Sequence, residues 1–139
     1  MLFSQVGGLP VRGPDGQAEL TEVGVLRALT VDAASARVTH LRVRAGVFGK
    51  LVLPWPVLRS FGPEGVVVGS LHFPGPAPPH HDILHRRILT DAGDRYGTVL
   101  DVAFDQVTGR VEAVFTTLGE VSPRRLLGLG DYALVVLKG

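Results

Sequence analysis

Cysteine is absent from this 139-residue sequence. Without it the chain forms no disulfide, offers no thiolate to a metal and has no cysteine nucleophile, a composition that suits a reducing compartment. Aromatic residues make up only 6%, with one tryptophan, so few side chains could stack on single-stranded RNA bases. No apolar run approaches the ~18 to 20 residues that are needed to cross a bilayer.

Charge is sparse and nearly balanced, with 14 Lys and Arg against 13 Asp and Glu and a net charge of +1. A dedicated nucleic-acid binder carries a strong basic excess, so no DNA partner is expected. The start "MLFSQVGGLPVRG" has no basic leader and reaches glycine and proline too early for a signal peptide. We therefore expect a soluble, cytoplasmic protein without a transmembrane segment.

Glycine and proline, by contrast, are abundant: 18 and 10 residues respectively divide the chain into short apolar runs. In "LRVRAG", Leu41 and Val43 alternate with two arginines, as in a strand with one buried face. In "VGVLRALTVD", Val25, Leu29 and Val31 share one parity and are expected on one face. Short apolar runs between turn residues, without a sustained helical period, predict an all-β protein.

One segment of the sequence occurs twice. A shift of 73 residues places "VGVLRALTVDAASARVTHLRVRAG" on "YGTVLDVAFDQVTGRVEAVFTTLG" without a gap. The positions that match best are Gly24 with Gly97, Asp32 with Asp105, Arg37 with Arg110, Val38 with Val111 and Gly46 with Gly119. Each copy is read as a strand, a turn, a long hairpin, a short connection and a final strand.

The hairpin turn differs between the copies. In "DQVTGR", the Asp105 carboxylate can accept backbone N–H bonds, and Gly109 supplies the positive φ that ends a type I turn with a bulge. The first copy reads "DAASAR", in which Asp32 is retained and Ala36 replaces the glycine. A left-handed Ala36 would carry strain of about 1 kcal/mol. Gly24 and Gly97 are interpreted as structural turn residues.

The segment "FPGPAPPHHDIL" separates the copies, and four prolines among residues 73–79 exclude a helix or a central strand. The predicted organisation is a first repeat over 1–72, an extended Pro/His-rich linker over 73–84 and a shorter second repeat over 85–139. The second copy is short by about one hairpin arm between Gly119 and Pro123. The copies are therefore expected to complete each other or to pair across a dimer.

This pattern of turn residues and apolar strands resembles the PRC-barrel family. The residues that carry the resemblance are Gly24, Asp32, Arg37, Val38, Pro54, Trp55, Pro56 and Gly62 in the first copy and Gly97, Asp101, Asp105, Gly109, Arg110, Val111, Pro123, Gly130 and Asp131 in the second. The family includes a cytoplasmic domain of the photosynthetic reaction centre and a domain of a ribosome-maturation factor. The resemblance implies a tandem of small β-barrels and, as partners, RNA-processing or ribosomal machinery or membrane-associated complexes.

Two features could bind a partner. His40, Arg42 and Arg44 share one strand face with Lys50 nearby, a stripe that could contact RNA phosphates or an acidic protein surface. A solvated outer face is the plainer explanation for such a stripe. Trp55 is interpreted as a plug of the core or barrel mouth, or as a protein-binding hot spot if it is exposed.

Metal binding is the alternative function. His80, His81, Asp82 and His85 include the i, i+4 spacing that places two imidazoles on one helical face. Solvated linker histidines are the plainer interpretation, and no cofactor is expected. No nucleophile elbow or triad is present, and "GLGDYA" precedes a strand instead of opening a helix, so we expect no enzyme.

The sequence thus predicts a non-catalytic β-barrel adaptor that binds a protein or ribonucleoprotein partner, linked to RNA processing or ribosome maturation. A metal-binding protein and a structural, strand-exchanged homodimer are the alternatives.

Overall fold

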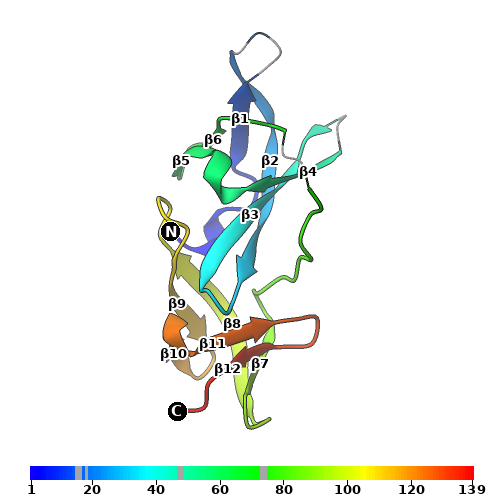
Figure 1. Ribbon diagram of the computed structural model, residues 1–139. Helices are drawn as coiled ribbons and strands as arrows, with labels where there is room; N and C mark the ends of the chain where they lie inside the picture. The colour runs from blue at the N-terminus through cyan, green and yellow to red at the C-terminus, as the bar shows by residue number, and fades with distance from the viewer. Residues whose placement is uncertain (15–16, 18, 47–48, 73–74) are drawn as a thin grey trace.

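The structure, a computed structural model, describes residues 1–14, 17, 19–46, 49–72 and 75–139. It is all-β, as predicted, and consists of two barrel-like units in tandem (Figure 1). The first six-stranded sheet has the strand order β4-β3-β2-β1-β6-β5, and the second repeats it as β10-β9-β8-β7-β12-β11. Residues 73 and 74, with which the predicted linker begins, lie outside the described residues.

Each strand of the first unit has a counterpart in the second. The first unit contains β1 (Pro10–Pro14), β2 (Leu20–Asp32), β3 (Arg37–Arg44), β4 (Lys50–Pro54), the 3₁₀ turn η3 (Trp55–Val57), β5 (Leu58–Gly62) and β6 (Gly65–Val68). The second contains β7 (Arg87–Thr90), β8 (Arg95–Phe104), β9 (Val111–Thr116), β10 (Gly119–Val121), η4 (Pro123–Arg125), β11 (Leu126–Leu129) and β12 (Leu134–Val136). In both units the first strand pairs in parallel with the last.

The expectation that the second copy lacks a hairpin arm is wrong. β10 pairs with β9 as β4 pairs with β3, but it has three residues where β4 has five. The arm is shortened and the strand order is kept.

Two β-bulges interrupt the pairing of β2 with β3, one at Arg27 in β2 and one at Thr39 in β3. Leu26 and Leu29 are buried and Val31 packs against the core, whereas Val25 is half-buried and does not belong to the core cluster, so the predicted common face is wrong for Val25. The register between β2 and β3 shifts between Leu26 and Ala28 and again after Thr30. Each extra residue reverses the alternation of side chains, which simple parity counting does not detect.

The predicted hairpin turns are confirmed. The Asp105 carboxylate accepts hydrogen bonds from the backbone N–H of Val107 at 2.7 Å and of Thr108 at 3.1 Å. Gly109 has φ 77° and Ala36 has φ 53°, so the alanine occupies the left-handed position of the glycine. The Asp32 carboxylate accepts a bond from Ser35 Oγ at 2.7 Å.

These turns join the two units by a reciprocal pair of hydrogen bonds. Val38 N donates to Gly109 O and Val111 N donates to Ala36 O, both at 2.8 Å. Each of these bonds is the counterpart of the other under the 73-residue shift. Between them, Arg37 forms an antiparallel bridge with its own counterpart, Arg110. A pseudo-two-fold axis therefore passes between the hairpin ends, each of which reaches the other unit (Figure 1).

The segments before β1 and β7 cross between the units in the same reciprocal way. The N-terminal segment, which includes η1 (Phe3–Gln5), lies along β8: Leu2 bridges Ala103, and the Asp101 carboxylate accepts bonds from Ser4. The segment around His80 lies on β2, where the counterpart of Ala103 is Thr30.

After crossing, each segment forms an equivalent backbone hydrogen bond with a strand of its own unit. Gly8 N donates to Leu26 O at 2.8 Å, and His85 N donates to Val99 O at 2.9 Å. Both residues have positive φ, 87° for Gly8 and 65° for His85. His85 is therefore the structural counterpart of a glycine.

A single apolar cluster contains the buried residues of both units. At its centre Phe104 packs edge-on against Phe3 at 5.3 Å and against Phe61 at 5.5 Å between ring centroids. A core residue of the second unit thus contacts two aromatic rings of the first, and the units share their apolar packing.

Candidate functional site

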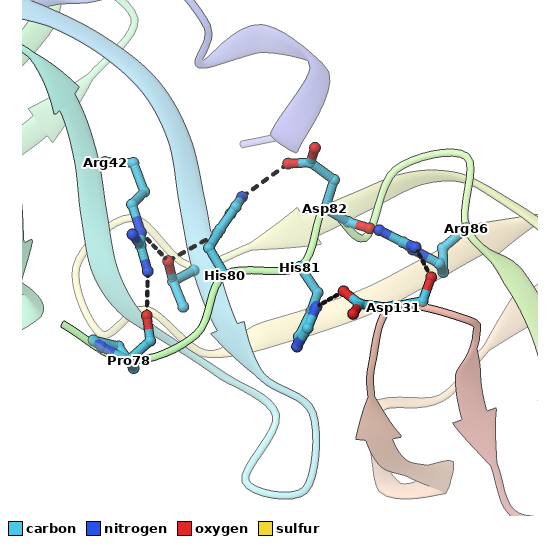
Figure 2. A network of polar contacts seen from close by, with 8 residues as sticks. Arg42, Pro78, His80, His81, Asp82, Arg86 and Asp131 are labelled. Atoms are coloured by element: carbon cyan, nitrogen blue, oxygen red, sulfur yellow. Dashed lines mark hydrogen bonds and ion pairs between the residues drawn. The ribbon is translucent and has the colours of Figure 1, made fainter. Parts of the chain in front are cut away.

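The linker is attached to the outer face of the first unit. Pro78 O accepts a hydrogen bond from the Arg42 guanidinium, whose Nε also donates to Thr30 Oγ1 at 2.9 Å (Figure 2). His80 Nδ1 lies 2.9 Å from the same hydroxyl, and its Nε2 lies 2.8 Å from Asp82 Oδ1. Thr30 is buried, so these bonds satisfy a hydroxyl that water does not reach.

The next linker residues attach to the second unit. His81 Nδ1 lies 2.7 Å from Asp131 Oδ1, which is ion-pair distance, although the angle is not that of a hydrogen bond. Arg86 donates to the carbonyl oxygens of Asp82 and Asp131 (Figure 2). Asp131 belongs to the turn closed by the bond from Gly130 N to Ala133 O, so "GLGDYA" forms a turn, as predicted.

The four predicted metal ligands do not form one cluster. His80 and Asp82 contact each other, His81 is directed to Asp131, and His85 is exposed. No group of three or more His, Asp or Glu side chains among the described residues could hold a metal ion. The expectation of solvated linker histidines is wrong for His80 and His81, whose side chains are 21% and 25% exposed because they hold the linker in place.

A groove of about 440 Å³ lies between this linker and the outer face of β2, β3 and β4. We call it the basic groove; it is lined by Arg27, Ala28, Arg42, Val43, Lys50, Leu51, Val52, His80 and Asp82. Arg44 lies opposite Lys50 in the β3–β4 register, next to this groove. The side chains of Arg27, Arg44 and Lys50 make no ion pair or hydrogen bond with a described residue, and all three are exposed.

The predicted basic stripe therefore divides into two roles. Arg42 and His40 are half-buried, and Arg42 is engaged by Thr30 and Pro78. Burial lowers the pKa of His40, and the nearby Arg42 charge lowers it further, so the imidazole is neutral at pH 7. Arg44 and Lys50 remain available to a partner.

Trp55 lies between the two units. Its ring stacks on Phe61 at 6.0 Å between centroids, and a Cβ added at Gly109 would lie 3.0 Å from its Cε2 atom. Because Trp55 is half-buried in this contact, its position agrees with the interpretation as a plug.

The glycines that begin the hairpins are required by close approach. A Cβ on Gly24 would lie 2.0 Å from Arg44 O, and one on Gly97, which has φ 84°, would lie 2.3 Å from Thr117 Oγ1. Both glycines therefore have a structural role, but they lie inside β2 and β8, so their interpretation as turn residues is wrong.

Sequence reasoning missed the residues that receive the linker. Thr30, Pro78, Arg86 and Asp131 hold it to both units. The available signal was the 73-residue shift, which pairs Thr30 with Ala103 and marks β2 and β8 as equivalent sites for a crossing segment.

Comparison with known proteins supports this architecture. The protein-family model of the PRC-barrel domain matches residues 79–138, a span that includes the end of the linker and the whole second sheet. No curated protein matches the sequence. Among the described residues no helix is long and apolar enough to cross a membrane. The strand order of the second unit is repeated in the first, and the chain contains a PRC-barrel domain at residues 79–138.

Proposed function

We propose that this protein is a non-catalytic adaptor whose first unit binds a ribonucleoprotein partner through the basic groove and the adjoining Arg44. The observation that carries the proposal is the set of exposed cations without counter-charge on one face, Arg27, Arg44 and Lys50. Phosphate groups of RNA would supply the missing negative charge. A role in RNA processing or ribosome maturation, in the cytoplasm, is part of this proposal.

The polar groups of the linker support a binding role over a catalytic one. His80 and Asp82 contact each other, and the histidine also reaches Thr30. Their contacts fix the linker as one wall of the groove. A fixed wall favours binding because less conformational freedom is lost when a partner docks.

The same geometry assigns Arg42 a positioning role. Its guanidinium holds Pro78 and Thr30, so replacing it would disturb the groove wall as well as remove charge. Arg44 and Lys50 are the better residues to mutate because their side chains have no intramolecular partner among the described residues.

The test is a pull-down from lysate of the source organism, with the tagged full-length protein as bait, with and without RNase. The double variant Arg44→Glu with Lys50→Glu should lose RNase-sensitive ribonucleoprotein partners. Arg12→Glu with Arg95→Glu is the matched control, because these arginines are also exposed and the charge change is equal. Partners that resist RNase and survive the Arg44/Lys50 reversal would contradict the proposal.

A further inference from the structure

Two arginines face each other where the units meet. Arg37 and Arg110 form an antiparallel bridge, flanked by the bonds from Val38 N to Gly109 O and from Val111 N to Ala36 O. With the hydrogen bonds on either side, the arginines form a non-hydrogen-bonded pair, in which the Cα atoms are about 4.5 Å apart and the side chains leave the same face. The backbone therefore holds two guanidinium-bearing side chains together on the pseudo-two-fold axis.

No ion pair among the described residues compensates the charge of this pair, although Asp32 lies opposite Arg37 in the β2–β3 register. Both arginines are exposed, and neither side chain makes an ion pair or hydrogen bond with a described residue. Glu112, two residues beyond Arg110 in the chain, lies in β9 and forms no ion pair with a described residue. Like charges placed directly opposite each other destabilise a strand pair, so this pairing costs stability unless an anion joins it.

A groove beside the pair adds a third guanidinium. It has a volume of about 390 Å³ and is lined by Ala34, Ser35, Ala36, Arg110, Val111, Pro123, Arg124 and Leu126. None of the described residues that line it is acidic. Arg124 extends the cationic surface from the axis into the second unit.

We propose that Arg37 and Arg110, assisted by Arg124, bind a phosphate group. Guanidinium groups present planar pairs of N–H donors that match phosphate oxygens, and their fixed positive charge attracts the negative charge of a phosphate group. A tetrahedral phosphate offers oxygens to donors arriving from two sides, as the two strands require. The group comes either from free inorganic phosphate or from the backbone of single-stranded RNA.

This site is separate from the basic groove, and its test uses different residues. In the full-length protein, inorganic phosphate at millimolar concentration, with ionic strength matched by NaCl, should raise the Tm by about 3 °C. Amide signals of residues 36–38 and 109–111 should shift in an NMR titration. Arg37→Gln with Arg110→Gln should abolish the specific rise and the shifts, whereas Arg95→Gln should retain both.

Each outcome decides the proposal. A phosphate response equal in the wild type and in the Arg37/Arg110 variant would overturn the site, because it would reflect general salting-out by phosphate. The variant itself should fold, because removal of like charges is expected to raise its phosphate-free Tm.

A second arm identifies the source of the phosphate. A short oligouridylate that binds the wild type at least tenfold more tightly than Arg37→Gln/Arg110→Gln assigns the site to RNA. Phosphate binding without oligouridylate binding assigns it to the free anion. Arg44→Glu/Lys50→Glu should leave the phosphate titration unchanged. The proposal for the basic groove and the proposal for the Arg37/Arg110 site are therefore tested separately.

Discussion

Exchanging the residues at the two equivalent turn positions should change stability in opposite directions. Ala36 and Gly109 both adopt left-handed backbone, with φ 53° and 77°. An alanine in that region carries strain of about 1.5 kcal/mol, within the usual range of 1–2 kcal/mol. Ala36→Gly removes this strain, and Gly109→Ala introduces it.

The surroundings make the two effects unequal. Ala36 is half-buried against the core, so its methyl contributes about 0.4 kcal/mol, and the added freedom of glycine in the unfolded chain costs about 0.4 kcal/mol. Ala36→Gly should thus stabilise the protein by about 0.7 kcal/mol. At Gly109 the new methyl would lie 3.0 Å from the Trp55 ring and 3.2 Å from Val38 O, which makes the total cost about 2 kcal/mol or more.

Urea unfolding and thermal melting measure both changes. At about 3 °C per kcal/mol for a chain of this length, Ala36→Gly should raise the Tm by about 2 °C and Gly109→Ala should lower it by about 6 °C. Unchanged m values would show that the denatured state is not altered. A lower urea midpoint for Ala36→Gly, or a neutral Gly109→Ala, would refute the turn assignment and its strain argument.

Further predictions concern a third turn, two titrations and cooperativity. His85→Gly should raise the Tm by about 3 °C, because His85 is exposed with φ 65° where the other unit has glycine; a lower Tm would contradict the equivalence. Burial and then Arg42 lower the pKa of His40, so the unfolded state takes up the proton first and stability falls as the pH drops below about 6.5; His40→Gln should flatten urea midpoints between pH 7.5 and 5.5. Hydrogen bonds from the backbone N–H of Thr108 and then of Val107 lower the pKa of Asp105. The stability that this carboxylate adds is therefore present above about pH 4 and is lost as the pH falls through its folded pKa. An NMR titration should show this lowered pKa, and an unshifted carboxyl would contradict the prediction. Calorimetry should show one transition, since Phe104 contacts rings of the other unit, and two resolved transitions would exclude a shared core.

The sequence was sufficient for the local features of the fold. Alternation in β3, the Asp105 turn and the left-handed Ala36 each depend on residues close together in the chain or on one hairpin pairing. Such features follow from side-chain periodicity and from glycine geometry. The repeat was visible because both copies form the same hairpin with the same residue types at equivalent positions.

Tertiary structure decided everything that depends on contacts between the units. Nothing local to Thr30 indicates that it receives His80, fifty residues away, and nothing local to Arg37 indicates that Arg110 lies opposite it. The bulges in β2 and β3 decide which side chains face the core, and they arise from pairing rather than from composition. The sequence by itself determined the two β units and their turns, whereas the crossing segments, the shared core and the axial arginine pair exist only because the two units pack together around a pseudo-two-fold axis.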